Sequence, residues 1–233
     1  MPNDPLKGLS SLQAWSLPPS PCRRRTVSAA CLLLASAAAG GCAIGPSVRP
    51  PPRLHDFGLL PEQPVRATRL RALLAVPDPS APGWLDTPSM LYRFAYVDGA
   101  QPQVYSLSRW AAPPAELIGA RLRSRLARIV EPGLASSRDG VAGEYVVRIE
   151  LEEFSQVFDT PSASRGVLRA RATLISGARR ATIAQRAFAF DRPAASADAA
   201  GGAAALAATG NDLVDAVIEW LAAELPRRAS APG

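Results

Sequence analysis

Beyond residue 54, apolar and polar positions follow the two periods that are typical of strands and helices. In seven segments, apolar side chains alternate with polar ones or run together over a short stretch. Such patterns predict β-strands. The predicted strands cover residues 54–60, 69–77, 90–97, 103–107, 144–158, 166–175 and 182–190. Turn residues at 98–99 and 177–180 predict two hairpins, one between the third and fourth strands and one between the last two.

The strand that begins at Glu144 changes phase along its length. Its apolar positions are odd-numbered up to Leu151 and even-numbered from Phe154 onward. One extra residue in a strand shifts the alternation in this way, so we expect a β-bulge near Glu152 and Glu153.

Two other segments have apolar residues at spacings of three and four, which predicts amphipathic helices. The first helix opens at Pro113 and Pro114, where a missing N–H costs nothing, and ends before Pro132. The second helix covers residues 199–225. These elements together predict a single α/β domain, in which two main helices pack on a mixed, mostly antiparallel sheet as a layered sandwich.

Both helices carry residues that need an interpretation of their own. The first helix has an arginine-rich face, which is typical of a solvated surface; the alternative is contact with anionic lipid head groups or an acidic partner. Its arginines are Arg121, Arg123, Arg125 and Arg128. In the second helix, Gly201, Gly202 and Gly210 each cost about 1 kcal/mol relative to alanine, so we expect the front half to fray.

The N-terminal region has the pattern of an export signal. Arg23–Arg25 precede an uncharged, alanine- and leucine-rich run, residues 27–39, which ends in Gly40-Gly41-Cys42. The run is shorter than the roughly 20 residues of a membrane span but suits the core of a secretory signal. A cysteine directly after small residues predicts a bacterial lipoprotein signal with lipid attachment at Cys42. Cleavage at another position, with Cys42 left as an ordinary thiol, is the alternative.

These patterns divide the chain into four segments. We expect a lipoprotein signal peptide at residues 1–41, a proline-rich tether at 42–53, an α/β domain at 54–226 and a flexible tail at 227–233. A proline-rich stretch favours the extended polyproline II conformation and acts as a semi-rigid spacer.

Charge excludes one class of partner. The formal net charge is +6, and half of this excess lies in residues 1–41. The remaining arginines alternate with acids and do not cluster with aromatic residues as a nucleic-acid surface requires. We therefore expect no nucleic-acid partner.

Residues for catalysis are sparse. His55 is the only histidine; it stands beside Asp56, and a Ser-His-Asp site would need a serine brought there by the fold. The chain has no nucleophile elbow, no phosphate loop and no histidines and cysteines at metal-binding spacing. Glu150, Glu152 and Glu153 form the densest carboxylate group, which is more typical of a solvated strand face than of a catalytic pair. We expect no enzymatic activity, no cofactor and no metal.

Four stretches together resemble the ABC-type transport auxiliary lipoprotein family. They are RLRALLAVPDPSAPGWLDTPSMLYRF, YSLSRWAAPPAELIGARLRSRLA, EEFSQVFD and NDLVDAVIEWLAAEL. The most specific piece is the Ser108–Pro113 stretch, where members of the family have an Arg-Trp-Ala motif just before a helix. The Trp84-Leu85-Asp86 loop and Glu152-Glu153-Phe154 add support.

The resemblance implies a periplasmic lipoprotein that assists a membrane transport system. Its implied partners are an MCE-domain protein and an ABC permease and ATPase that move lipids or other hydrophobic molecules. Ala43 stands where many inner-membrane lipoproteins have aspartate, which favours attachment to the outer membrane. The alternative is an envelope-assembly lipoprotein or scaffold with no transport role. Self-association of the chain stays open.

Two sets of aromatic and basic residues allow both a structural and a binding role. Trp110 is expected to fill the core and Arg109 to pair with a strand carboxylate, because tryptophan is a large hydrophobic anchor; docking of a partner is the alternative. The aromatic face of Tyr92, Phe94 and Tyr96 is expected to be core, with a lipid groove as the alternative.

Overall fold

The computed structural model describes residues 50–59, 69–136 and 140–225. Cys42 and the predicted signal, tether start and tail lie outside these residues. The elements are β1 (Arg53–His55), β2 (Leu70–Arg71), β3 (Leu74–Ala75), β4 (Ser89–Phe94), β5 (Asp98–Trp110), α2 (Pro114–Leu126), β6 (Val130–Glu131), β7 (Leu134–Ala135), β8 (Tyr145–Thr160), β9 (Ala163–Ser176), β10 (Ala181–Pro193) and α3 (Ala199–Glu224).

Strand β8 is the centre of an eight-stranded sheet. One edge of β8 pairs antiparallel with β9, and β9 pairs antiparallel with β10. The other edge pairs in parallel with β3 near the start of β8 and with β4 near its end. Strand β5 follows β4 as a hairpin, and β1 adds to the last three residues of β5 in parallel. The sheet is therefore mixed and mostly antiparallel, as predicted.

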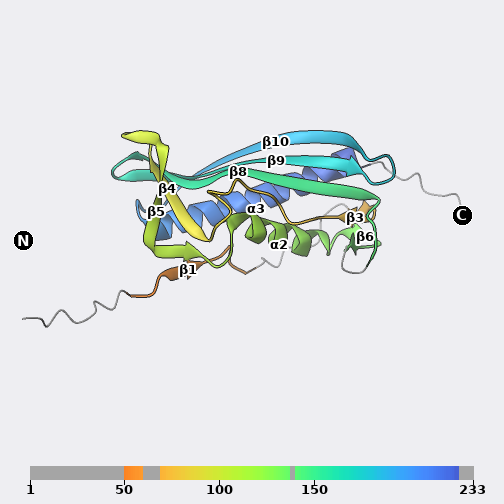
Figure 1. The fold of residues 1–233 in the computed structure, drawn as a ribbon, viewed down its shortest axis with the longest axis horizontal. Coiled ribbons are helices and arrows are strands. Elements are labelled where there is room, and N and C mark those ends of the chain that lie inside the picture. Colours follow the sequence, from red (N-terminus) through yellow and green to blue (C-terminus); the bar gives the residue numbers. More distant parts are fainter. Residues whose placement is uncertain (1–49, 60–68, 137–139, 226–233) are drawn as a thin grey trace, which may run out of the picture. The chain divides into compact units, whose positions relative to one another are not determined.

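Helices α2 and α3 pack against the sheet, and α3 runs along β8, β9 and β10 (Figure 1). The stripe of α3 that faces the sheet is buried, as its spacing predicted. Trp220 of this stripe contacts Phe188 of β10, with ring centroids 6.3 Å apart. The sequence prediction of one α/β domain with two main helices is confirmed.

The predicted bulge in β8 is also confirmed. Leu151 pairs with Ala170 and Glu153 pairs with Arg169, so Glu152 is the extra residue. The bulge returns the next apolar side chains to the helix side, and Phe154 and Phe158 are buried there.

The segment 69–77, predicted as one central strand, is instead two short strands. β2 pairs in parallel with β6, and β3 pairs in parallel with β7. Paired residues differ in number by the same amount in both pairs, so the two segments run side by side and their pairing is interrupted once. The gap lies opposite Pro132 and Gly133. Proline has no N–H to donate to the ladder, and Gly133 has a φ of +142°, so pairing stops and resumes in a different sheet.

The first predicted strand is shorter than expected. β1 ends at His55, because the Asp56 carboxylate accepts a hydrogen bond from the Gly58 N–H at 2.8 Å and Gly58 adopts a φ of +71°. This turn directs Phe57 into the core. The turn of the β4–β5 hairpin also differs: it covers residues 95–97, so Tyr96 lies in the turn and Asp98 already belongs to β5.

The arginine face of α2 is solvated only at Arg128, which is exposed, so the prediction of a solvated face was wrong for Arg121, Arg123 and Arg125. The Arg121 guanidinium is buried and donates a hydrogen bond to the Gly58 carbonyl. Arg123 forms an ion pair with Asp78 and Arg125 with Asp215 of α3. Burial lowers the pKa of Arg121 from its ordinary value. Arg121, Arg123 and Arg125 therefore connect α2 to neighbouring segments.

The glycines of α3 were also misinterpreted. Gly201, Gly202 and Gly210 are buried, and each lies where a Cβ atom would collide with another part of the fold. Asp198 caps the helix by accepting a hydrogen bond from the Gly201 N–H at 2.8 Å. Glycine is needed here for close approach, so the front of α3 is packed.

Candidate functional site

Trp110, at the end of β5, lies in the centre of an aromatic core. Its side chain is fully buried, with its ring centroid 5.3 Å from that of Phe154 and 6.0 Å from that of Phe57. The Trp110 backbone N–H donates to the Pro88 carbonyl at 2.8 Å, which fixes the end of β5. No described residue accepts a hydrogen bond from the indole N–H. A direct contact between Trp110 and a partner would therefore require the core to open.

Arg109 has the opposite environment. Neighbouring strand positions face opposite sides of a sheet, so Arg109 is exposed while Ser108 and Trp110 are buried. Within the part of the chain that the structure describes, Arg109 forms no ion pair. The strand carboxylate expected to pair with it is not found there.

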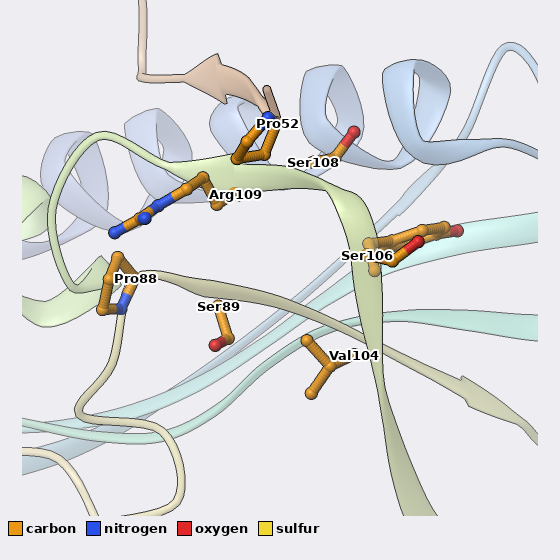
Figure 2. Close-up of a pocket in the computed structure, with 8 residues that line it drawn as sticks. Pro52, Pro88, Ser89, Val104, Ser106, Ser108 and Arg109 are labelled. Atoms are coloured by element: carbon orange, nitrogen blue, oxygen red, sulfur yellow. The ribbon is translucent and has the colours of Figure 1, made fainter. Parts of the chain in front are cut away.

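Arg109 borders a cavity of about 260 Å³ at an irregularity of the β4–β5 hairpin (Figure 2). Ser89 pairs with Arg109 and Leu91 pairs with Val104, so a step of two residues on β4 is matched by a step of five on β5. The extra residues make β5 bend away from β4 and open the cavity. Its lining residues are Pro52, Pro88, Ser89, Val104, Tyr105, Ser106, Ser108 and Arg109.

A chain of hydrogen bonds connects this bend with the start of α3. The Tyr105 hydroxyl donates to Gln156 Oε1 at 2.8 Å. Gln156 Nε2 donates to Ser164 Oγ at 2.7 Å and to the Asp198 carbonyl at 3.1 Å. Burial, assisted by the nearby Tyr92 and Asp198, raises the pKa of Tyr105 to about 12, so the hydroxyl stays protonated as a donor at neutral pH. The sequence placed Gln156 only within the predicted strand 144–158, because hydrogen bonds between residues far apart in the chain have no local sequence signal.

Tyr92, Phe94 and Tyr96 belong to a larger aromatic cluster that includes Tyr105 and Phe158. The Tyr92 ring centroid lies 4.5 Å from that of Tyr105, and the Phe94 centroid lies 5.3 Å from that of Phe158. Phe158 is buried, Tyr92 and Phe94 are half-buried and Tyr96 is exposed. The expected burial of this face holds only in part.

The candidate catalytic groups do not form a constellation among the described residues. The His55 ring packs edge-on against Trp110, and its Nε2 has no hydrogen-bond partner among the described residues. The Asp56 carboxylate accepts a hydrogen bond from the Gly58 N–H and does not bond to His55 Nε2. Glu150 and Glu152 both face Arg171, and Glu153 pairs with Arg93 at 3.0 Å.

Two further observations bear on the kind of site. In residues 50–59, 69–136 and 140–225, no group of three or more histidine, cysteine or carboxylate side chains is arranged to hold a metal. No helix in those same ranges is both long and apolar enough to span a bilayer.

The geometry defines a two-layer α/β domain. An exposed arginine, Arg109, and a cavity lie at its β1–β5 edge. Sequence comparison gives the particular family: the sequence profile of the ABC-type transport auxiliary lipoprotein component matches residues 58–218. The chain belongs to this family. No curated protein matches the chain.

Two solved structures share the fold, and a third is less similar. Protein XCC0632 from Xanthomonas campestris is 20% identical, with 72% of this chain and 93% of that chain covered and a TM-score of 0.61. An uncharacterized protein is 15% identical, with 73% and 99% covered and a TM-score of 0.50. The dodecameric PelC of Paraburkholderia phytofirmans is 14% identical, with 69% and 92% covered and a TM-score of 0.39.

Proposed function

We propose that this protein is a non-enzymatic periplasmic lipoprotein that serves as an auxiliary component of an ABC/MCE-type transport system. The system would move lipids or other hydrophobic molecules between the inner and outer membranes. The observation that carries the proposal is the family match over residues 58–218, which covers most of the described domain. An anchor at Cys42 and a short tether would hold the domain at a membrane face. The proposed partners are an MCE-domain protein, an ABC permease and its ATPase.

Capture of the tagged full-length protein from gently solubilised envelopes tests the transport role. We expect the MCE-domain protein and the permease to co-purify with it, and a strain lacking the lipoprotein gene to show altered permeability to hydrophobic compounds. The matched control is an unrelated lipoprotein with the same tag. Co-purification of envelope-assembly components alone would support the alternative, an assembly or scaffold lipoprotein with no transport role.

Substitution of the proposed lipid attachment site, Cys42→Ala, tests the anchor. Thioether attachment requires the Cys42 sulfur, so we expect complete loss of radiolabelled palmitate from the protein and loss of its outer-membrane fractionation. Cys31→Ala, within the proposed signal, is the control and should keep the label. Equal labelling of the wild type and Cys42→Ala would contradict the proposed anchor.

A further inference from the structure

Exposed apolar and basic side chains gather on two neighbouring strands, where the chain enters the described domain. β1 pairs with the end of β5 so that Arg53 lies beside Ser108 and Leu54 beside Arg109. Leu54 is 66% exposed, Val104 58% and Leu107 49%. Leu54 shares one side of the sheet with Arg109, and Arg53 lies on the other side with Ser108, so these residues surround the sheet edge that β1 and β5 form. We call Arg53, Leu54, Val104, Leu107 and Arg109 the entry patch. Single exposed apolar residues are ordinary, but several on adjoining strands indicate a contact surface.

The two arginines of the entry patch are available to an anion. Neither Arg53 nor Arg109 forms an ion pair with any described residue. On β9, by contrast, Arg165 and Arg171 each contact two carboxylates. A guanidinium that lacks an internal carboxylate can bind a phosphate oxygen, and its planar fork suits that group.

The cavity beside Arg109 adds room and hydroxyl groups to this surface. Val104 and Arg109 both border the cavity, together with Ser89 and Ser106 (Figure 2). Its volume of about 260 Å³ has room for several groups of the size of water, which occupies about 30 Å³ in the liquid, and hence for a phosphate group. Pro52, which directly precedes β1, also borders the cavity.

The chain that precedes the described domain limits the distance between the entry patch and a membrane. Pro50 lies eight positions after Cys42, with seven residues between them. Even fully extended, a segment of this length spans at most about 29 Å. If Cys42 carries lipid, the entry patch cannot move far from the bilayer surface.

We propose that the entry patch is a membrane-contact surface that binds an anionic phospholipid bilayer. Arg53 and Arg109 bind lipid phosphates, and Leu54, Val104 and Leu107 enter the interfacial region, as in other proteins that lie on a membrane. The proposal rests on the proposed anchor at Cys42 for its proximity to lipid. The chemistry of the patch can be tested without that anchor.

Features of β5 favour a bilayer over an added strand from another protein. Pro102 lies within β5 and has no N–H for a new ladder. The bend between Val104 and Arg109 interrupts the regular edge that strand addition requires. A lipid surface needs only exposed side chains, which the patch supplies.

The test measures binding of the unlipidated chain, residues 43–233, to vesicles by co-sedimentation. The described core lies entirely within residues 50–225, so this chain keeps every described contact. We expect binding to phosphatidylcholine vesicles that contain phosphatidylglycerol, and weaker binding as salt screens the charges. Arg53→Glu with Arg109→Glu should weaken binding by roughly thirtyfold or more, because each arginine near an anionic surface contributes about fivefold. Leu54→Ser with Val104→Ser should weaken binding to charged and uncharged vesicles alike.

Matched controls change exposed residues elsewhere in the same way. Arg148→Glu with Arg179→Glu makes the same change in charge, and Ile183→Ser removes an exposed apolar side chain from β10. All variants should melt like the wild type.

The proposal is overturned if the wild-type chain does not bind the vesicles, or if the Arg148/Arg179 variant loses as much affinity as the patch variant. Altered self-association of the patch variants with unchanged vesicle affinity would assign the patch to a second copy of the chain instead. Palmitate labelling is scored separately, so a failed anchor and a failed patch are distinguishable.

Discussion

Trp110→Ala is expected to lower the free energy of unfolding by about 3–5 kcal/mol, because the substitution leaves a cavity in the centre of the core. Trp110 is fully buried among His55 of β1, Phe57 of the turn after β1 and Phe154 of β8. The removed ring therefore costs contacts in several elements at once. Denaturant unfolding followed by circular dichroism measures the change.

Trp110→Phe and Arg109→Ala are the matched variants. Phenylalanine keeps most of the buried ring, and no described residue hydrogen-bonds to the indole N–H, so Trp110→Phe should cost much less than Trp110→Ala. Arg109→Ala should leave the melting temperature unchanged, because the side chain is exposed. Unchanged stability of Trp110→Ala together with lost partner capture would contradict the core role and support docking.

Gly202→Ala is expected to destabilise the protein by about 1–3 kcal/mol through overpacking. An added Cβ would lie 1.9 Å from Gln156 Oε1. Gln156 cannot move aside without losing its bonds to Tyr105, Ser164 and the Asp198 carbonyl. Helix propensity alone predicts the opposite sign, a gain of about 1 kcal/mol. Thermal and denaturant unfolding of the variant give the sign directly.

A double-mutant cycle with Gln156→Ala separates the two effects. Removal of the Gln156 side chain vacates the space that the new methyl group needs. In that background Gly202→Ala should be neutral or stabilising, since only helix propensity remains. Equal destabilisation in both backgrounds would show that the collision with Gln156 is not the cause.

The regular elements could be predicted because their signals are local. The phase change in β8 identified the bulge at Glu152, and the spacing in α3 identified its buried stripe. The segment 69–77 was predicted incorrectly because its interruption is caused by Pro132 and Gly133, which are distant in sequence. A strand's continuity depends on its partner as well as on its own side chains.

The candidate surface could be predicted only in part. Arg109 and Trp110 stood out in sequence as a motif before a helix, but their different burial follows from strand alternation and the packing of Phe154. Leu54 and Val104 gave no signal, because they become neighbours of Arg109 only through the β1–β5 pairing and the bend in β5.

The sequence by itself determined the α/β class, the order of the main helices and strands, and the family, because periodicity and motifs depend only on residues that are close together in the chain. Only the tertiary structure decided which arginines are paired, which glycines are required and which exposed residues form the entry patch. These properties depend on contacts between residues far apart in sequence. A glycine costs helix stability or enables close packing according to what lies beside it, and in α3 it is Gln156 that lies beside Gly202.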